Sequence, residues 1–180
     1  PLSFSENEIQ KIIKMMRDKK FFIQVGLNRR FDQDFVITKK KVDAGLIGDI
    51  HTIHITNHDA AIPGFKFLKS SGGMLFDLCI HDFDMLNFLT GEKIKEVYVN
   101  GNVFIEPRLK EIGDIDNAII TIELESGILC SIDSSRQTHY GYDQRIEIFG
   151  SKGVMSVENK PEGLYYFSNQ ESTETSKIKH

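Results

Sequence analysis

The residues best suited to acid–base chemistry lie between Asp77 and Asp84. Asp77 and His81 are four positions apart, and Asp84 follows three positions later. In a helix this spacing places the three side chains on one face. A carboxylate beside an imidazole favours the protonated imidazole and fixes its tautomer, which suits a general base that must accept a hydroxyl proton. The spacing alone leaves a second interpretation open, a solvated polar helix face.

Short polar side chains also stand where a predicted strand ends. Asn57 and Asp59 close the strand predicted over residues 50–57. They could converge on a polyhydroxylated ligand, or they could form an Asx-type turn that starts the next loop. Tyr142 lies on a turn between two later strands. Its hydroxyl could bind a ligand, or its ring could simply cover the edge of a sheet.

Two adjacent arginines, Arg29 and Arg30, follow an earlier predicted strand and could bind an anion. The nearby Asp32 is equally a good N-cap for the helix that comes next. A purely structural interpretation of this segment therefore stays open.

A metal site is the competing interpretation of His81 and Asp84, because His-Asp pairs occur in metal-dependent phosphohydrolases. Such centres need several converging ligands, and the remaining histidines show no ligand spacing. We therefore expect no metal. Asp82 falls within the apolar stripe of the predicted helix, where only a buried hydrogen bond or a place at a helix end would explain it.

The sequence lacks the usual device for holding a dinucleotide. None of its 14 glycines forms a G-x-G-x-x-G or P-loop pattern, so no segment is predicted to cradle a pyrophosphate.

The elements that must position these residues are early helices and late strands. Helices are predicted over 6–19, 32–44 and 74–89, the first opened by a capping box of Ser5 and Glu8. Strands are predicted over 21–25, 50–57, 97–99, 103–105, 118–125, 128–137, 145–149, 154–158 and 164–167. This order predicts an α+β fold, an open, mostly antiparallel β-sheet with helices on one face. The polar face of strand 50–57 is then either solvated or an oligomer interface.

The composition is that of a soluble globular protein. Hydrophobic residues make up 40% and charged residues 27% of the 180, and the net charge of -4 argues against a nucleic-acid partner. No apolar run approaches the ~18 residues of a membrane span. Two cysteines make no disulfide framework, so we expect a reducing, cytoplasmic location.

Taken in order, several segments resemble one family. These segments are residues 26–32, 45–48, 57–59, 71–73 with Asp77 and His81, 113–116 and 140–145. Over about residues 1–160 the series resembles the C-terminal domain of the Gfo/Idh/MocA oxidoreductases, and within that family the inositol dehydrogenases.

The resemblance implies an NAD- or NADP-dependent oxidation of a secondary hydroxyl on a polyol or sugar. It implies that His81 is the general base and that Asp77 orients the substrate and partners His81. The positions implied to bind substrate are Arg29, Asn57, Asp59 and Tyr142, of which Arg29 and Tyr142 also lie near the cofactor. The family often has Arg-Asp-Pro where this chain has His58-Asp59-Ala60, so the particular polyol or sugar is left open.

The resemblance also implies a division of the chain. Residues 1–26 resemble the last helix and edge strand of a Rossmann domain, and residues 27–180 resemble the substrate-binding and oligomerisation domain without its final helices. The family's Glu-Lys-Pro motif would end at Pro1, so we expect a fragment that is inactive alone and whose cofactor binds through the missing domain. A homodimer or homotetramer through the sheet face is expected, with no nucleic-acid or membrane partner. The alternative is a non-catalytic oligomerisation or ligand-binding module.

Overall fold

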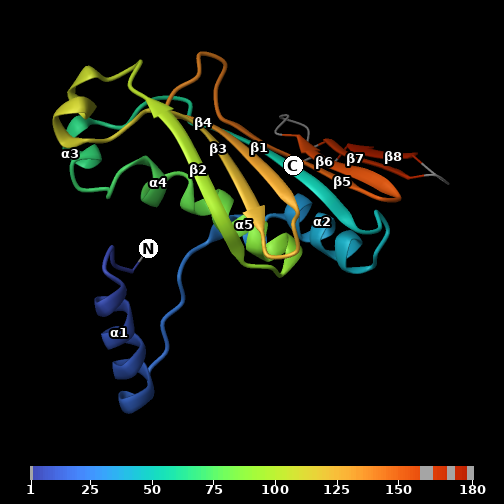
Figure 1. Ribbon diagram of the computed structural model, residues 1–180, viewed down its shortest axis with the longest axis horizontal. Coiled ribbons are helices and arrows are strands. Elements are labelled where there is room, and N and C mark those ends of the chain that lie inside the picture. The colour runs from blue at the N-terminus through green and yellow to red at the C-terminus, as the bar shows by residue number, and fades with distance from the viewer. Residues whose placement is uncertain (1, 159–163, 170–172, 178–180) are drawn as a thin grey trace.

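An eight-stranded sheet with the order β2-β3-β4-β1-β5-β6-β7-β8 forms the body of the computed structural model, which describes residues 2–158, 164–169 and 173–177 (Figure 1). Its strands are β1 (Ile50–His58), β2 (Ile94–Asn102), β3 (Asn117–Leu124), β4 (Leu129–Ser135), β5 (Asp143–Gly150), β6 (Gly153–Glu158), β7 (Leu164–Asn169) and β8 (Thr173–Lys177). Among the strands of the described residues, only β1 and β4 pair in parallel, and every other neighbouring pair is antiparallel. The predicted open, mostly antiparallel sheet is confirmed.

Helices lie against one face of this sheet, as predicted. The helical elements are α1 (Glu6–Lys19), η1 (Asn28–Phe31), α2 (Gln33–Asp43), α3 (Phe65–Leu68), α4 (Met74–Asp77), α5 (Ile80–Thr90) and η2 (Pro107–Ile112). Figure 1 shows α2 and α5 on the same side of the sheet. The carboxylate of Asp32 caps α2 by accepting the backbone N–H groups of Asp34 and Phe35.

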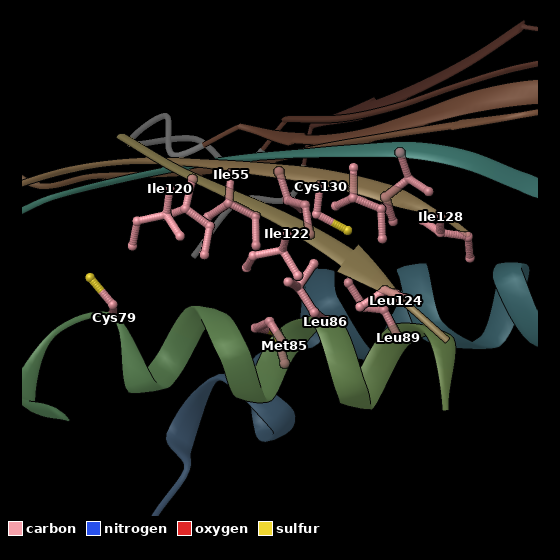
Figure 2. Packing of buried hydrophobic residues seen from close by; sticks show 14 of the residues in the cluster. Ile55, Cys79, Met85, Leu86, Leu89, Ile120, Ile122, Leu124, Ile128 and Cys130 are labelled. Atoms are coloured by element: carbon pink, nitrogen blue, oxygen red, sulfur yellow. The ribbon is translucent and has the colours of Figure 1, made fainter. Parts of the chain in front are cut away.

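The core lies between α5 and the central strands. Met85, Leu86 and Leu89 of α5 point toward Ile55 and Ile120 on the sheet, and all five are buried (Figure 2). Along β3 every second side chain is buried, because successive strand residues point to opposite faces. Each fully buried aliphatic side chain contributes about 1.5–3 kcal/mol, so this face fixes how the strands above the helices are placed.

The helix predicted over 74–89 is wrong in one respect, because it is broken between α4 and α5. Leu78 and Cys79 are both buried, and a straight helix would turn them about 100° apart. The break lets both face the core: the Cys79 N–H bonds to the Met74 carbonyl, five residues back, at 3.0 Å. Asp77 and His81 therefore belong to different helices. The i,i+4 pair predicted between them assumed one continuous helix, which the structure does not have.

Two of the predicted strands are also wrong. Residues 103–105 leave the sheet because the Asp116 carboxylate takes the backbone N–H groups of Phe104, Ile105 and Glu106, each at 2.8 Å. Residues 21–25 form no strand and pair with none of the strands that the structure describes, and Phe22 is 83% exposed. The strand predicted over 164–167 is confirmed as β7, whereas β8 was not foreseen.

The N-terminal helix stands apart from the sheet (Figure 1). None of the residues in α1 is buried. The predicted capping box does not form: Ser5 makes no side-chain cap, and Glu8 accepts a hydrogen bond from Ser3 instead. The Phe4 ring touches Phe76 edge-on at 5.7 Å between centroids. In the described part of the chain, no helix has both the length and the apolar character needed to cross a bilayer.

Candidate active site

A polar pocket of about 560 Å³ opens where α4 and α5 meet the ends of β1 and β5. It is lined by Asn28, Arg29, Asp59, Ala60, Ala61, Pro63, Phe67, Asp77, Leu78, His81, Tyr142 and Gln144. Five of the six predicted site residues are in this lining, although they come from segments far apart in the sequence. A pocket of this size suits a small-molecule ligand.

A larger hollow of about 750 Å³ lies on the sheet face that the helices leave open. It gathers the aromatic rings of Tyr98 and Phe104 with the amides of Asn100, Asn102 and Asn117. Its lining, as far as the chain is described, includes no histidine or arginine, so the smaller pocket is the one equipped for acid–base chemistry.

His81 is the imidazole of the pocket, and its ring finds no hydrogen-bond partner among the residues that the structure describes. Burial lowers the pKa of His81, and the positive charge of Arg29 lowers it further. Asp82, Asp77 and Asp84 act in the opposite direction but do not prevail. The sequence predicted an imidazole kept protonated by Asp77, whereas the structure favours a neutral imidazole that can accept a proton.

Arg29 is held at the pocket by a buried counter-ion. Its Nη1 donates to Asp82 Oδ1 at 2.5 Å, and Asn57 Nδ2 donates to the other carboxylate oxygen at 2.6 Å. Burial raises the pKa of Asp82, while Arg29 and Asn57 oppose that rise. Asp82, for which the sequence suggested at most a buried hydrogen bond, is thus the anion that fixes Arg29.

Asn57 itself lies beneath the pocket rather than in its lining. It is fully buried, and its Nδ2 also lies 3.4 Å from the Leu78 carbonyl at the break between the two helices. The predicted contact of Asn57 with a substrate is therefore not supported by its position, since the residue is fully buried and its Nδ2 is engaged with Asp82 and Leu78.

Asp77 pairs with an arginine that the sequence did not single out. Arg136 Nη1 donates to Asp77 Oδ2 at 2.8 Å, and Arg136 is completely buried just after β4. The signal that could have found it is positional: β4 runs parallel to β1, and the carboxyl ends of parallel strands meet at one edge, where ligands bind. That parallel pairing was not predicted.

Asp59 and Tyr142 form a second polar pair in the lining. Burial raises the pKa of Asp59, and a hydrogen bond from the Tyr142 hydroxyl opposes the rise. Burial and the same hydrogen bond raise the pKa of Tyr142 to about 12, so this phenol stays protonated and donates.

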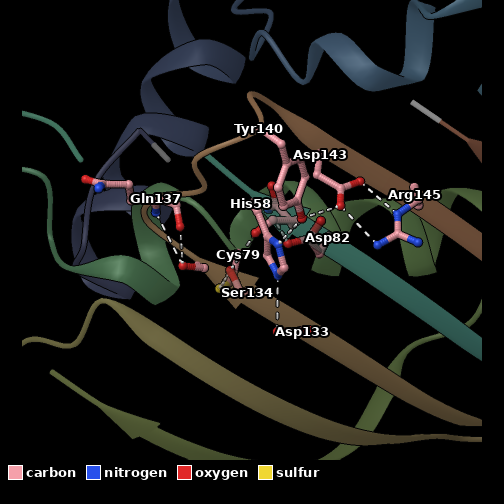
Figure 3. A network of polar contacts seen from close by, with 11 residues as sticks. His58, Cys79, Asp82, Asp133, Ser134, Gln137, Tyr140, Asp143 and Arg145 are labelled. Atoms are coloured by element: carbon pink, nitrogen blue, oxygen red, sulfur yellow. Dashed lines mark hydrogen bonds and ion pairs between the residues drawn. The ribbon is translucent and has the colours of Figure 1, made fainter. Parts of the chain in front are cut away.

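The turn that carries Tyr142 is flanked by a network of polar contacts that includes His58, Tyr140 and Asp143 (Figure 3). The Tyr140 hydroxyl donates to Asp143 at 2.9 Å, and Arg145 Nε donates to the same carboxylate at 2.8 Å. His58 Nδ1 lies 3.3 Å from the Tyr140 hydroxyl. These contacts tie the turn to β1 and β5, so Tyr142 is presented from a braced segment.

Comparison with known proteins agrees with this geometry. The model of the GFO/IDH/MocA C-terminal domain matches residues 35–156. The chain belongs to the Gfo/Idh/MocA oxidoreductase family. The match includes five of the six predicted site positions, Asn57, Asp59, Asp77, His81 and Tyr142, and leaves out Arg29.

Relatives within the Gfo/Idh/MocA family are similar over most of this chain. An uncharacterized oxidoreductase of Bacillus subtilis, YrbE, is 43% identical over 88% of the chain and 47% of its own length. A myo-inositol 2-dehydrogenase of Thermotoga maritima is 37% identical over 95% of the chain and 51% of its own length. The chain thus spans about half the length of the curated relatives it matches.

A solved structure extends the comparison to the fold. The scyllo-inositol dehydrogenase of Lactobacillus casei, with bound NAD(H) and scyllo-inositol, superposes with a TM-score of 0.79 at 27% identity, covering 100% of this chain and 55% of that one.

Within the described residues, no group of three or more His, Cys, Asp or Glu side chains is arranged to hold a metal ion.

Proposed function

We propose that the chain is the substrate domain of an oxidoreductase that uses NAD or NADP to oxidise a secondary hydroxyl of an inositol-like polyol. The observation that carries the proposal is the His81 imidazole, which lacks a protein partner in the described part of the chain and faces a polar pocket. The other ionisable groups there are two carboxylates, a guanidinium and a phenol, which are suited to binding several hydroxyls. The names of the Thermotoga maritima and Lactobacillus casei relatives support an inositol as the polyol.

His81 takes the role of general base. Its neutral imidazole accepts the proton of the hydroxyl oxygen. The carbon that bears this hydroxyl gives up its hydrogen as a hydride, and the alcohol becomes a ketone. A bound NAD or NADP would supply the acceptor for that hydride. Asp77 and Asp59 are placed to accept hydrogen bonds from neighbouring hydroxyls, and Arg29 is placed to donate them.

The residues of this chain fit the substrate side of such a reaction. Arg29 and Tyr142 share the pocket lining and could contact the nicotinamide end of a cofactor. The sequence offers no glycine-rich phosphate loop, so we assign the rest of the cofactor to a separate nucleotide-binding domain. Residues 1–26 are assigned to that domain and residues 27–180 to the substrate domain. The exposure of α1 and of Phe22 supports this division.

Self-association through the open sheet face is part of the same proposal. Tyr98, Ile119, Leu129 and Phe149 stand on strands of the sheet, and each is at least 40% exposed. A homodimer or homotetramer would cover them. Light scattering tests this: the wild-type chain should exceed the mass of a monomer, and Ile119→Asp should lower it. A monomeric wild-type mass at high concentration would contradict the assembly. We also propose a cytoplasmic location, which agrees with the two free, buried cysteines.

The test of the function is titration calorimetry of the chain with myo-inositol. Binding is expected for the wild-type chain and should be lost in Asp59→Ala, whereas cyclohexanol, with a single hydroxyl, should not bind. In a second experiment, the chain is joined to the remaining half of the Thermotoga maritima relative, and NAD-dependent turnover of myo-inositol by this chimera is measured. A folded chain that binds no polyol would refute the proposal, and binding without turnover in the chimera would favour the non-catalytic ligand-binding module.

A further inference from the structure

Arg136 is a buried charge whose cost to stability needs an explanation. Its side chain is 1% exposed, and only Nη1 has a hydrogen-bond acceptor. Nε and Nη2 find no acceptor in the part of the chain that the structure describes. Native proteins rarely leave buried donors unpaired, and an apolar side chain of similar volume is often at least as stable as a buried ion pair. The placement therefore indicates a role at the pocket rather than in the core.

The backbone around Arg136 is firmly anchored. Its N–H donates to the Asp116 carbonyl at 2.9 Å. Asp116 is in turn fixed by the three backbone N–H groups of residues 104–106 that its carboxylate accepts. The backbone that carries the Arg136 guanidinium is therefore held in place.

The contact with Arg136 uses only one of the two oxygens of the Asp77 carboxylate. Oδ2 is taken by Arg136, while the Asp77 side chain keeps 25% of its surface exposed in the pocket lining. No hydrogen bond joins Asp77 to His81 in the described residues. The charge of Arg136 also acts on Asp59 across the pocket, where it favours the ionised carboxylate.

We propose that Arg136 is a positioning residue of this pocket, which holds the Asp77 carboxylate as an acceptor for a polyol hydroxyl and keeps it from pairing with His81. The inference deepens the proposed function and rests on it for the identity of the ligand. It replaces the aspartate–histidine pair expected from the sequence with an aspartate–arginine pair beside an independent imidazole.

The test combines two readouts on the full chain, the NMR titration of the His81 imidazole and calorimetry with myo-inositol. Asp77→Asn keeps an acceptor for Arg136 but removes the charge. It should weaken myo-inositol binding roughly 10- to 100-fold. The His81 midpoint should fall only slightly, because Asp77 acts on His81 through its charge and without a hydrogen bond in the described residues. Arg29, Asp82 and Asp84, the other charges that act on His81, are unchanged in this variant.

Arg136→Met removes the guanidinium and frees Asp77. It should weaken myo-inositol binding to a similar extent and move the His81 midpoint to higher pH, and adding Asp77→Asn should cancel that movement. Arg136→Lys, which keeps the charge, should lie closer to the wild-type chain. Arg108→Met is the matched control, because Arg108 is an exposed arginine paired with Glu106 away from the pocket.

The outcomes separate the inference from the function it rests on. A fall of about one pH unit or more in the His81 midpoint of Asp77→Asn would make Asp77 the partner of His81 and overturn the inference, even if Arg136→Met fails to fold. Unchanged readouts in a folded Arg136→Met would also overturn it. If the wild-type chain binds no myo-inositol while the His81 titrations behave as expected, the positioning role stands and the proposed function fails.

Discussion

Two arginine–aspartate pairs flank His81, and they are arranged in opposite senses. In one pair the cation lines the pocket: Arg29 faces the ligand space, and its partner Asp82 is completely buried. In the other pair the anion lines the pocket: Asp77 faces the ligand space, and its partner Arg136 is buried. The pocket therefore presents a cation, Arg29, and an anion, Asp77. Each is held by a buried counter-ion that does not line the pocket.

The difference between the pairs lies in how completely the buried member is satisfied. Both oxygens of Asp82 accept hydrogen bonds, one from Arg29 and one from Asn57. Arg136 uses one nitrogen of three in the described structure. The Arg29 side is thus closed and built into the packing, whereas the Asp77 side is less completely satisfied and more exposed. Removing the aspartate should therefore affect stability more in the first pair, where Asp82 is buried, and ligand binding more in the second pair, where Asp77 lines the pocket.

The largest expected effect falls on the group between the pairs. In the chimera with the Thermotoga maritima relative, His81→Ala should lower kcat by roughly 10²–10⁴, because the general base is lost. The free energy of unfolding should change little, since the ring makes no hydrogen bond within the described residues. Leu86→Ala is the matched control: it should cost about 2–5 kcal/mol of stability and spare kcat per folded molecule. A kcat within a factor of a few in His81→Ala would make His81 a bystander.

The second effect compares the two aspartates directly. Asp82→Ala leaves Arg29 buried without its counter-ion and should lower the free energy of unfolding by about 3–5 kcal/mol. Asp77→Ala should cost less, about 1.5–3 kcal/mol. The Asp77 side chain is 25% exposed whereas Asp82 is completely buried, so water that enters the space left by Asp77 can replace the acceptor that Arg136 loses. Urea unfolding of the wild-type chain and both variants measures the order. An equal or reversed order would show that the pairs do not differ as described.

Sequence patterns predicted the fold well because burial repeats with the period of each element. The alternation along β3 and the turn at Ser126 and Gly127 placed the hairpin of β3 and β4 where it is observed. The failures occur where one side chain redirects the backbone, since periodicity carries no information about such contacts. Asp116 withdraws residues 103–105 from the sheet, and two adjacent buried residues break the helix before α5.

The sequence predicted most of the residues of the candidate site but not which of them form hydrogen bonds and ion pairs with one another. Five of the six residues meet in one pocket, yet the partner expected for Asp77 was the near neighbour His81 rather than Arg136, 59 positions away. Helical spacing describes only local neighbours, and the distant partners depend on the parallel alignment of β1 with β4. Asn57 was misplaced for the same reason, because its partner Asp82 reaches it only through the packing of α5 on the sheet.

The smallest expected effect is a pH dependence of stability that originates at His81. Its pKa is lowered from 6.5 by burial and by Arg29, so the unfolded chain binds this proton more readily than the folded chain. Stability is then fully present above the ordinary histidine pKa and is lost as the pH falls through the lowered value. The neighbouring carboxylates Asp59 and Asp82, whose pKa values are raised, contribute in the opposite sense, with stability that is lost as the pH rises through their own raised values.

Urea unfolding between roughly pH 7.5 and pH 5 isolates the histidine contribution, because the ordinary pKa of histidine lies within this window. His81→Gln should flatten the decline in stability toward low pH, whereas His139→Gln, on an exposed turn, serves as the matched control and should keep it. If both variants decline as steeply as the wild-type chain, the His81 ring is not held neutral by its surroundings. The Arg29–Asp82 pair would then stabilise the fold without tuning the base, and the functional half of the comparison would rest on Asp77 alone.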